Sequence, residues 1–221
     1  MVVKLFGASF SGHTLRVAMV MQEYNVPFEL IKVDMVQGEH QSDAYLNNHP
    51  FGQVPYIDDD GFILYESRAI SWYIATKYRD NIKAPLLPDM YKDTKKYAIF
   101  EQAASVNECH WERYTTKMVR QLLIEPMFDN EPDERVVEES LQCLNNTFDV
   151  YDRILSRQKY LAGDVSTIKV GAEIDSVANG AFQDFTLVDI FHLHTFHVFS
   201  SKALISTEGR PNVERYDFSS A

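Results

Sequence analysis

The sequence changes its pattern near residue 80, and this change limits the folds open to the chain. Before it, short apolar segments alternate with helix-like segments; after it, every periodic segment is helical. Residues 79–91 separate the two parts, contain Pro85 and Pro88, and show no helical period, which is typical of a linker. We therefore expect two domains, an α/β domain at residues 1–80 and an all-α domain at residues 92–221.

The first part predicts a mixed sheet covered by helices. Its order is strand, helix, strand, helical turn, strand, strand, helix. The acidic turn Asp58-Asp59-Asp60-Gly61 between the last two strands indicates a hairpin. We expect strands at residues 2–6, 28–35, 54–57 and 62–65, helices at 15–24 and 67–78, and the helical turn within the polar segment 38–50.

The second part predicts long helices. Residues 93–123 fit one helix that ends before Pro126, and residues 134–156 carry an apolar stripe at helical spacing. A further helix follows Thr186-Leu187-Val188-Asp189, a Thr-x-x-acid signal in which the threonine caps the N–H groups near Asp189.

Composition excludes several classes of protein. The 221 residues are 45% hydrophobic, which argues against disorder, and 21 basic against 32 acidic residues give a net charge of −11. Such a charge opposes binding to nucleic acid or to an anionic membrane. No segment approaches the ~18 apolar residues of a membrane span, and no leader is recognisable at the N-terminus. Two cysteines, Cys109 and Cys143, suit a reducing compartment, so we expect a cytoplasmic protein.

Three clusters contain residues that could bind a ligand or take part in a reaction. Ser9–Arg16 joins a strand to a helix, where a hydroxyl acts either as a helix cap or as a ligand for an anion at the positive helix end. In Phe51–Pro55, a cis Val54–Pro55 bond would turn the Val54 N–H and C=O outward, where a peptide pairs as an added strand. Glu66 and Ser67 begin the next helix and match the ammonium and carboxylate of an amino acid.

Together these clusters resemble the glutathione S-transferase family, phi class. The matching motifs are SxxTxR at Ser11–Arg16, GEH at Gly38–His40, NHPFGQVP at Asn48–Pro55 and YESRAI at Tyr65–Ile70. The resemblance runs from Val2 to Asp164 and from Asp184 to about Tyr216. It implies a thioredoxin-like N-terminal domain, an all-helical C-terminal domain, a homodimer and a role in detoxification. It also implies conjugation of glutathione, as co-substrate and without a cofactor, to hydrophobic electrophiles.

The resemblance assigns roles residue by residue. Ser11 resembles the catalytic hydroxyl that activates the glutathione sulfur, as a hydrogen-bond donor rather than a nucleophile. Many relatives have Lys where this chain has Gln41, which removes one charge from the expected site. The glutathione-binding residues implied are His40 and Gln41 at the glycine end, Gln53 and Val54 at the peptide backbone, and Glu66 and Ser67 at the γ-glutamyl end.

The electrophile pocket is expected between the domains. Its candidate walls are Phe10 and Gly12 from one side and Trp111, Tyr114 and Met118 from the other. Aromatic and methionine side chains at helical spacing equally form an ordinary helix core, and the sequence does not separate the two interpretations.

Metal binding is not expected. His192, His194 and His197 invite a metal interpretation, but on a helix His194 and His197 lie ~200° and ~140° from His192, so the three do not share a face.

The chain departs from the family pattern in its last third. Residues 165–183 stand between a Leu-Ala-Gly-Asp turn and a Phe-Thr-Leu-x-Asp signal that follow each other directly in relatives, and the chain stops soon after Tyr216. We expect an exposed loop that contributes nothing to glutathione binding. The departures favour an alternative function, a non-catalytic binding or regulatory protein that keeps the ligand site.

Overall fold

The computed structural model describes residues 2–83, 85–163, 185–201 and 204–216, in two units, Met1–Leu87 and Pro88–Ala221. The predicted insertion at residues 165–183 lies outside the described residues, as do Asp164 and Asp184 on its flanks. In the described ranges, no helix combines the length and apolar character that crossing a bilayer requires.

The first unit is built on a four-stranded mixed sheet of order β2-β1-β3-β4. The strands β1 and β2 are parallel, whereas β1–β3 and β3–β4 are antiparallel, which gives the mixed sheet that the sequence predicts. The elements are β1 (Val3–Gly7), α1 (Gly12–Glu23), β2 (Phe28–Lys32), η1 (Glu39–Gln41), α2 (Asp43–Leu46), β3 (Tyr56–Asp59), β4 (Phe62–Tyr65), α3 (Ser67–Lys77) and η2 (Arg79–Asn81).

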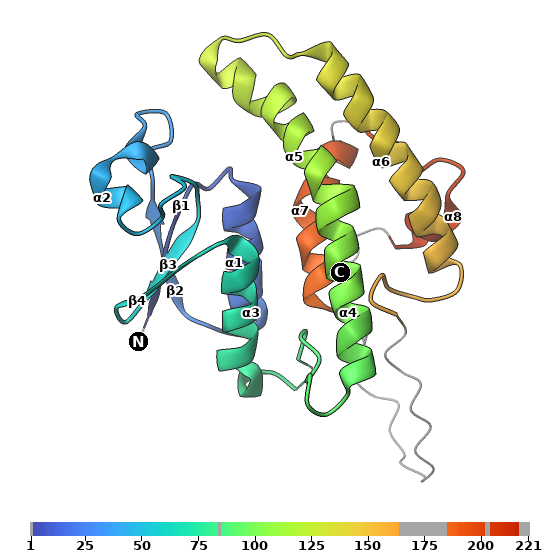
Figure 1. Cartoon of the computed structure of the whole chain (residues 1–221), viewed down its shortest axis with the longest axis horizontal. Helices are drawn as coiled ribbons and strands as arrows, with labels where there is room; N and C mark the ends of the chain where they lie inside the picture. Colours follow the sequence, from blue (N-terminus) through green and yellow to red (C-terminus); the bar gives the residue numbers. More distant parts are fainter. Residues whose placement is uncertain (1, 84, 164–184, 202–203, 217–221) are drawn as a thin grey trace. The chain divides into compact units, whose positions relative to one another are not determined.

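Within this unit, α1 and α3 lie side by side on one face of the sheet, and α2 lies on the other side (Figure 1). Apolar residues recur on the inner faces of α1 and α3, so the two helices close a core over β1 and β3. The side chains at its centre are fully buried: Leu5, Val17, Val20, Met21, Ile57, Ile70 and Ile74.

The β3–β4 turn follows the predicted hairpin. Asp60 and Gly61 both have positive φ, 59° and 86°, which is the geometry of a tight turn matched to the twist of two antiparallel strands. The Asp58 carboxylate accepts from the Gly61 N–H at 2.7 Å and fixes the turn.

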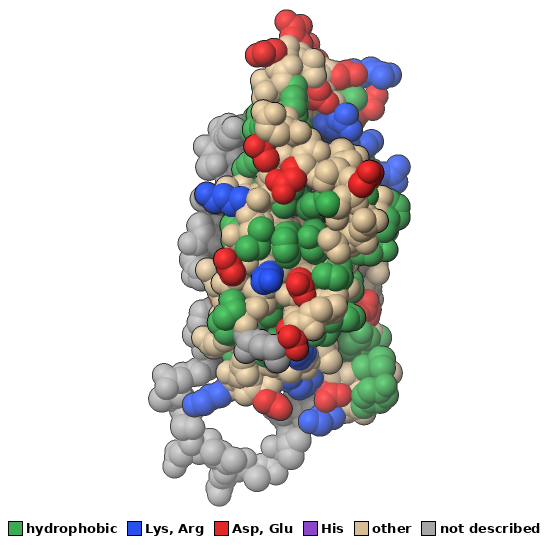
Figure 2. Space-filling model, turned by 90° about the vertical axis from the view of Figure 1, so that its left-hand side faces the viewer, with side chains coloured by type: hydrophobic (Ala, Val, Ile, Leu, Met, Phe, Trp, Pro, Cys, Tyr) green, Lys and Arg blue, Asp and Glu red, His purple; other side chains and the backbone are tan. Residues whose placement is uncertain are grey.

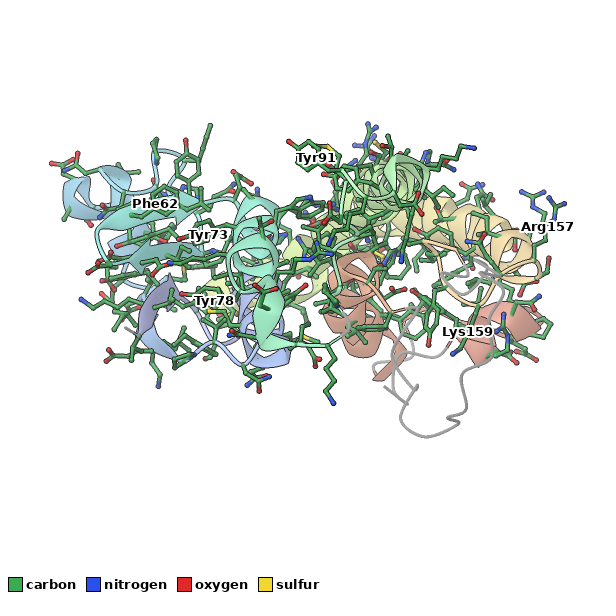
Figure 3. The ribbon with its side chains drawn as sticks, turned by 90° about the horizontal axis from the view of Figure 1, so that it is seen from below. Phe62, Tyr73, Tyr78, Tyr91, Arg157 and Lys159 are labelled. Carbon is green, nitrogen blue, oxygen red and sulfur yellow. The ribbon has the colours of Figure 1, made fainter. Side chains whose placement is uncertain are left out.

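A polar cluster ties this hairpin to α3. Asp59, 6% exposed, accepts hydrogen bonds from the Tyr73 hydroxyl at 2.7 Å and from Lys77 at 2.5 Å. Burial acts to raise the pKa of Asp59, but the bonds from Lys77 and Tyr73 outweigh it and hold that pKa below its usual value. The Phe62 ring lies against Tyr73 with centroids 5.1 Å apart, and both are labelled in Figure 3.

The first unit continues past residue 80. Asn81 donates to the Tyr24 carbonyl at 3.0 Å, and the Leu86 N–H donates to the Tyr24 hydroxyl at 2.9 Å. The proline-containing segment therefore holds to the end of α1 before the chain enters the second unit at Pro88.

The second unit is helical in its described residues. Its elements are α4 (Thr94–Val106), α5 (Arg113–Val119), α6 (Glu134–Leu155), α7 (Leu187–Ser201) and α8 (Pro211–Arg215), with the short segments η3 (Asn107–Glu112), η4 (Arg120–Ile124) and η5 (Glu125–Phe128). The helix predicted over residues 93–123 is a continuous helical run, but two π-helical segments, η3 and η4, interrupt its α-helical hydrogen bonding.

Trp111 lies at the centre of this unit, 1% exposed. Its ring centroid lies 5.4 Å from that of Phe148 and 6.2 Å from that of Phe196, and its indole N–H donates to the Thr195 hydroxyl at 2.9 Å. The core thus joins η3, α6 and α7, and a buried polar atom of the tryptophan is satisfied within it.

The start of α7 agrees in part with the predicted cap. The Thr186 N–H donates to the Asp189 carboxylate at 2.7 Å, which is the acidic half of the capping box. The prediction that the Thr186 hydroxyl accepts from the N–H groups near Asp189 is wrong. The hydroxyl donates to the Asp189 carboxylate at 2.9 Å, and the Asp189 N–H donates to the Thr186 carbonyl. Asp189 is fully buried, and a carboxylate there needs more donors than the backbone supplies, so the hydroxyls of Thr186 and Tyr216 turn to it.

The face of the molecule in Figure 2 carries acidic and basic side chains interspersed with neutral and hydrophobic ones. On this face the acidic excess of the sequence is spread out rather than gathered into one patch.

The environment of Asp189 predicts how stability changes with pH. Burial raises the pKa of Asp189 to about 6 against the hydrogen bonds from Tyr216 and Thr186, which lower it. A carboxyl with a raised folded-state pKa stabilises the fold fully below its unfolded value of 3.8, and this contribution is lost as the pH rises toward 6. Measured by urea unfolding, the free energy of unfolding of the wild type relative to Asp189→Asn should fall across this range and level off above it. A difference that rises with pH would contradict this ionisation.

Candidate functional site

The strand register gathers the predicted site segments at one end of the sheet. Phe6, Tyr56 and Tyr65 are neighbours across β1, β3 and β4, and Gly7 pairs with Lys32 at the end of β2. The chain leaves the sheet at this end after β1, β2 and β4, and enters it here at β3. Four groups of predicted residues follow or precede these strand ends: Ser11; His40 and Gln41; Gln53 and Val54; Glu66 and Ser67.

Ser11 is the N-cap of α1, which begins three residues earlier than the apolar pattern predicted. Its backbone is extended, with φ −78° and ψ 122°, and its Oγ accepts from the Thr14 N–H at 3.4 Å. The side chain is half-buried. Since the oxygen accepts from the helix, its hydrogen is left to donate to another group.

Gly7 fixes the approach of α1 to β1. A Cβ at this position would lie 2.5 Å from both Cγ2 and Oγ1 of Thr14, inside van der Waals contact. Thr14 itself is 1% exposed, and its N–H is the donor to Ser11. The absence of a side chain at Gly7 therefore allows the helix start, and with it the Ser11 hydroxyl, to sit against the strand end.

Glu66 and Ser67 begin α3 through a strained backbone. Glu66 is exposed and has φ 71°, a left-handed value that costs a non-glycine residue free energy and marks functional sites. Ser67, the first residue of α3, is 8% exposed, and its Oγ accepts from Arg16 Nη1 at 3.1 Å. No local pattern in the sequence indicates this contact, which joins residues 51 positions apart.

Two side chains donate hydrogen bonds to the backbone of the Gly52–Pro55 loop. The Gln41 amide nitrogen donates to the Gly52 carbonyl at 3.0 Å, and the Tyr45 hydroxyl donates to the Gln53 carbonyl at 2.7 Å. The Val54–Pro55 bond is cis, which is the condition under which the sequence analysis expected Val54 to turn its peptide groups outward. In the described part of the chain, neither the N–H nor the C=O of Val54 has a hydrogen-bond partner. The loop is fixed, and Val54 presents an unpaired peptide edge.

Two histidines lie beside this loop. His40, in η1, is half-buried, and its Nδ1 has no hydrogen-bond partner among the residues described. His49, which the sequence analysis did not predict, is 2% exposed and packs on Tyr65 with centroids 4.8 Å apart. Burial lowers the pKa of His49, partly offset by the charge of Glu66. His49 therefore packs on Tyr65, beside the Gly52–Pro55 loop, as an uncharged ring at neutral pH.

The residues predicted for the electrophile pocket differ in exposure. Phe10 is 51% exposed, and Gly12 is the first residue of α1. Trp111 and Met118 are 1% and 0% exposed and belong to the core of the helical unit, which is the alternative that the sequence left open. Tyr114 is half-buried and lines a groove of about 310 Å³ with Cys143, whose hydrogen bond raises the pKa of the Tyr114 hydroxyl.

No cluster of three potential metal ligands is found in the described ranges. His192 serves the helical core instead: its Nδ1 faces the Val188 carbonyl at 2.8 Å, and its Nε2 faces Asn107 and Tyr151, each at 3.0 Å. The side chains of His194 and His197 lie outside the described residues.

Comparison with known proteins gives one family. Residues 1–76 match the N-terminal domain of glutathione S-transferases. The chain is 38% identical over 193 residues to glutathione S-transferase PM239X14 of Arabidopsis thaliana, across 86% of this chain and 78% of that one. It is 35% identical over 218 residues to glutathione S-transferase hmp2 of Hypomyces subiculosus, across 98% and 92%.

Solved structures agree. Glutathione transferase F7 of Populus trichocarpa superposes with a TM-score of 0.81 at 29% identity, across 97% of this chain and 91% of that one. Maize glutathione S-transferase I, in complex with an atrazine glutathione conjugate, gives 0.79 at 28% identity, across 98% and 90%. These likenesses confirm the predicted thioredoxin-like domain followed by a helical domain.

The Gly7–Thr14 contact can be tested by mutation. Gly7→Ala should reduce the free energy of unfolding by about 1–3 kcal/mol, because the new methyl group overlaps Thr14. Thr14→Ala removes both overlapping atoms and leaves only Cβ, at 3.1 Å, so the double variant should recover part of this loss. Urea unfolding of the three variants measures both effects. A Gly7→Ala protein as stable as the wild type would show that α1 is not fixed by this contact.

Proposed function

Because the chain belongs to the phi class of the glutathione S-transferase family, we propose that it is a transferase that conjugates glutathione to hydrophobic electrophiles. The observation that carries the proposal is the Ser11 hydroxyl at the start of α1, with its oxygen engaged by the Thr14 N–H and its hydrogen left to donate. The maize relative bound to a glutathione conjugate supports the same class of reaction.

Ser11 acts on the sulfur of glutathione. A free thiol has a pKa near ~8.5, so only ~3% is thiolate at pH 7. A hydroxyl donor and the positive end of α1 both stabilise the thiolate; lowering the pKa by ~2 units makes about three quarters of it ionised, for ~2.7 kcal/mol. The thiolate then forms a carbon–sulfur bond with the electrophile, whose leaving group departs with the bonding pair, while the thiol proton passes to solvent.

The other segments at the same end of the sheet bind the backbone and the two ends of glutathione. Val54 pairs its N–H and C=O with the cysteinyl backbone of glutathione as an added strand, beside Gln53. Glu66 holds the γ-glutamyl ammonium, and Ser67 with the first N–H groups of α3 holds its carboxylate. His40 takes the glycine carboxylate at Nδ1.

Gln41 has a different task from the one implied by the family resemblance. Its amide nitrogen is used in holding the Gly52 carbonyl, so it stabilises the loop that presents Val54. The glycine end of glutathione then depends on His40 without help from a neighbouring cation.

The electrophile, we propose, lies near Phe10 and Gly12 at the start of α1, where Phe10, the residue before Ser11, is 51% exposed. Tyr114, half-buried, belongs to the groove on the helical unit that it lines with Cys143. Trp111 and Met118 act through the core that supports this part of the helical unit.

We also propose a homodimer that works in detoxification in the cytoplasm. The outer face of α4 and α6 supports the dimer, because it holds two adjoining grooves of about 390 and 310 Å³ with Ile99 and Val150 48% and 41% exposed. Cys109 and Cys143 form no disulfide, which suits a reducing compartment. Light scattering should give twice the 25.5 kDa of one chain, and Val150→Glu should shift the protein toward a monomer.

The function is tested by measuring conjugation of an aromatic halide beside the affinity for glutathione. We expect glutathione to bind by calorimetry and the halide to be released with turnover. Binding without turnover would favour the alternative, a non-catalytic binding or regulatory protein. Absence of binding would contradict both.

Ser11→Ala should lower turnover far more than glutathione affinity, because the hydroxyl stabilises the thiolate and not the tripeptide. The ultraviolet absorbance of the thiolate of bound glutathione should titrate at a higher pH than in the wild type. Ser11→Thr keeps a hydroxyl that can cap the helix and should retain part of the activity. Full activity with an unchanged titration in Ser11→Ala would remove Ser11 from the mechanism.

A further inference from the structure

Arg16 carries a buried charge to which the proposed function gives no role. Arg16 lies on the buried side of α1 and is 3% exposed. Its Nη1 donates to the Ser67 Oγ on α3 at 3.1 Å. Removing a guanidinium from water is costly, so a buried arginine is expected to be held by specific hydrogen bonds. Here one of those bonds ends on a residue of the ligand site.

The chemistry of the two groups fixes the direction of the bond. A guanidinium has only donors, so Ser67 must accept, and its own hydrogen is left to donate elsewhere. Among the described residues, no acceptor for that O–H is found. Ser67 is also the first residue of α3, where the backbone N–H groups have no acceptor within the helix.

The surroundings of Ser67 favour an anion. The start of α3 carries the positive end of the helix dipole, and a hydroxyl that accepts from a cation is a stronger donor than an isolated one. The site therefore offers a polarised O–H and adjacent N–H groups to a carboxylate.

We propose that Arg16 is a positioning residue for glutathione recognition, which holds the Ser67 hydroxyl so that its O–H donates to the carboxylate of the γ-glutamyl residue. Arg16 itself does not touch glutathione. The proposal rests on the proposed function, because it requires Ser67 to bind that carboxylate. It makes affinity for one end of the tripeptide depend on a side chain inside the domain.

The test is a double-mutant cycle on glutathione affinity, with Arg16→Gln, Ser67→Ala and the double variant measured by calorimetry. Arg16→Gln should weaken binding about tenfold, as expected for loss of a charge-assisted hydrogen bond. In the double variant, the loss should equal that of Ser67→Ala alone, because Arg16 acts only through Ser67. In steady-state kinetics, KM for glutathione should rise while kcat changes less than twofold.

A second ligand tests the end of glutathione that is affected. The tripeptide with 4-aminobutyryl in place of γ-glutamyl keeps the amine and lacks the carboxylate. We expect its affinity to be the same for the wild type and Arg16→Gln, since there is no carboxylate for Ser67 to hold. An equal loss for both tripeptides would overturn the proposal.

Two further variants separate positioning from general stability. Val17→Ala, at the next residue of α1 and fully buried, removes packing from the same helix but no hydrogen bond to Ser67, and should leave the affinity unchanged. Arg16→Lys keeps a donor and the charge, and should restore part of the affinity lost in Arg16→Gln; it also serves if Arg16→Gln does not fold.

The outcomes distinguish this proposal from the function on which it rests. Independent effects in the cycle, or an Arg16→Gln protein that binds glutathione like the wild type, would overturn the role of Arg16 alone. A wild type that does not bind glutathione, or a Ser67→Ala protein that binds it unchanged, would overturn the assigned site and the role of Arg16 with it.

Discussion

The side-by-side register of Phe6, Tyr56 and Tyr65 in the central sheet is the constraint on which the site depends. It places the end of β1, the start of β3 and the end of β4 in one row, so that the segments carrying Ser11, Val54 and Ser67 leave the sheet together. A slip of one residue would turn every side chain of a strand to the opposite face. The Phe6 and Tyr56 rings, stacked with centroids 4.4 Å apart, and the Tyr45 ring set on edge against Tyr56 oppose such a slip.

Ser11 and Ser67 are prepared for a ligand in the same way. Each lies at a helix start, and each oxygen accepts a hydrogen bond from the domain: Ser11 from the Thr14 N–H, Ser67 from the Arg16 guanidinium. When the oxygen of a hydroxyl accepts a hydrogen bond from the protein, its O–H remains to donate to a ligand. The difference lies in the donor. A backbone amide belongs to its own helix, whereas Arg16 links α1 to α3, so it also fixes the distance between the two helix starts.

Local signals in the sequence were sufficient to predict the order of strands and helices and the hairpin at Asp60-Gly61, because each depends on a few adjacent residues. The contacts of Arg16 with Ser67 and of Gln41 with Gly52 join residues 51 and 11 positions apart, and no local pattern encodes them. The family resemblance implied the site residues, and the contact of Gln41 with the Gly52 carbonyl is an addition that the resemblance did not give. The π-helical segments in the long helix have no sequence signal of their own.

In the helical unit, His192 contributes to the packing of the core. His192 raised the question of a metal, yet its ring is enclosed by three protein groups. The Val188 carbonyl only accepts and the Asn107 amide nitrogen only donates, so the ring must carry its hydrogen on Nδ1 and accept at Nε2. In this arrangement Nδ1–H donates to Val188, and the single lone pair of Nε2 is shared by Asn107 and Tyr151, so a metal at Nε2 would have to displace both. Since these two residues come from η3 and α6 and His192 comes from α7, the ring joins three segments of one core. Its role is therefore to fix the helices against one another.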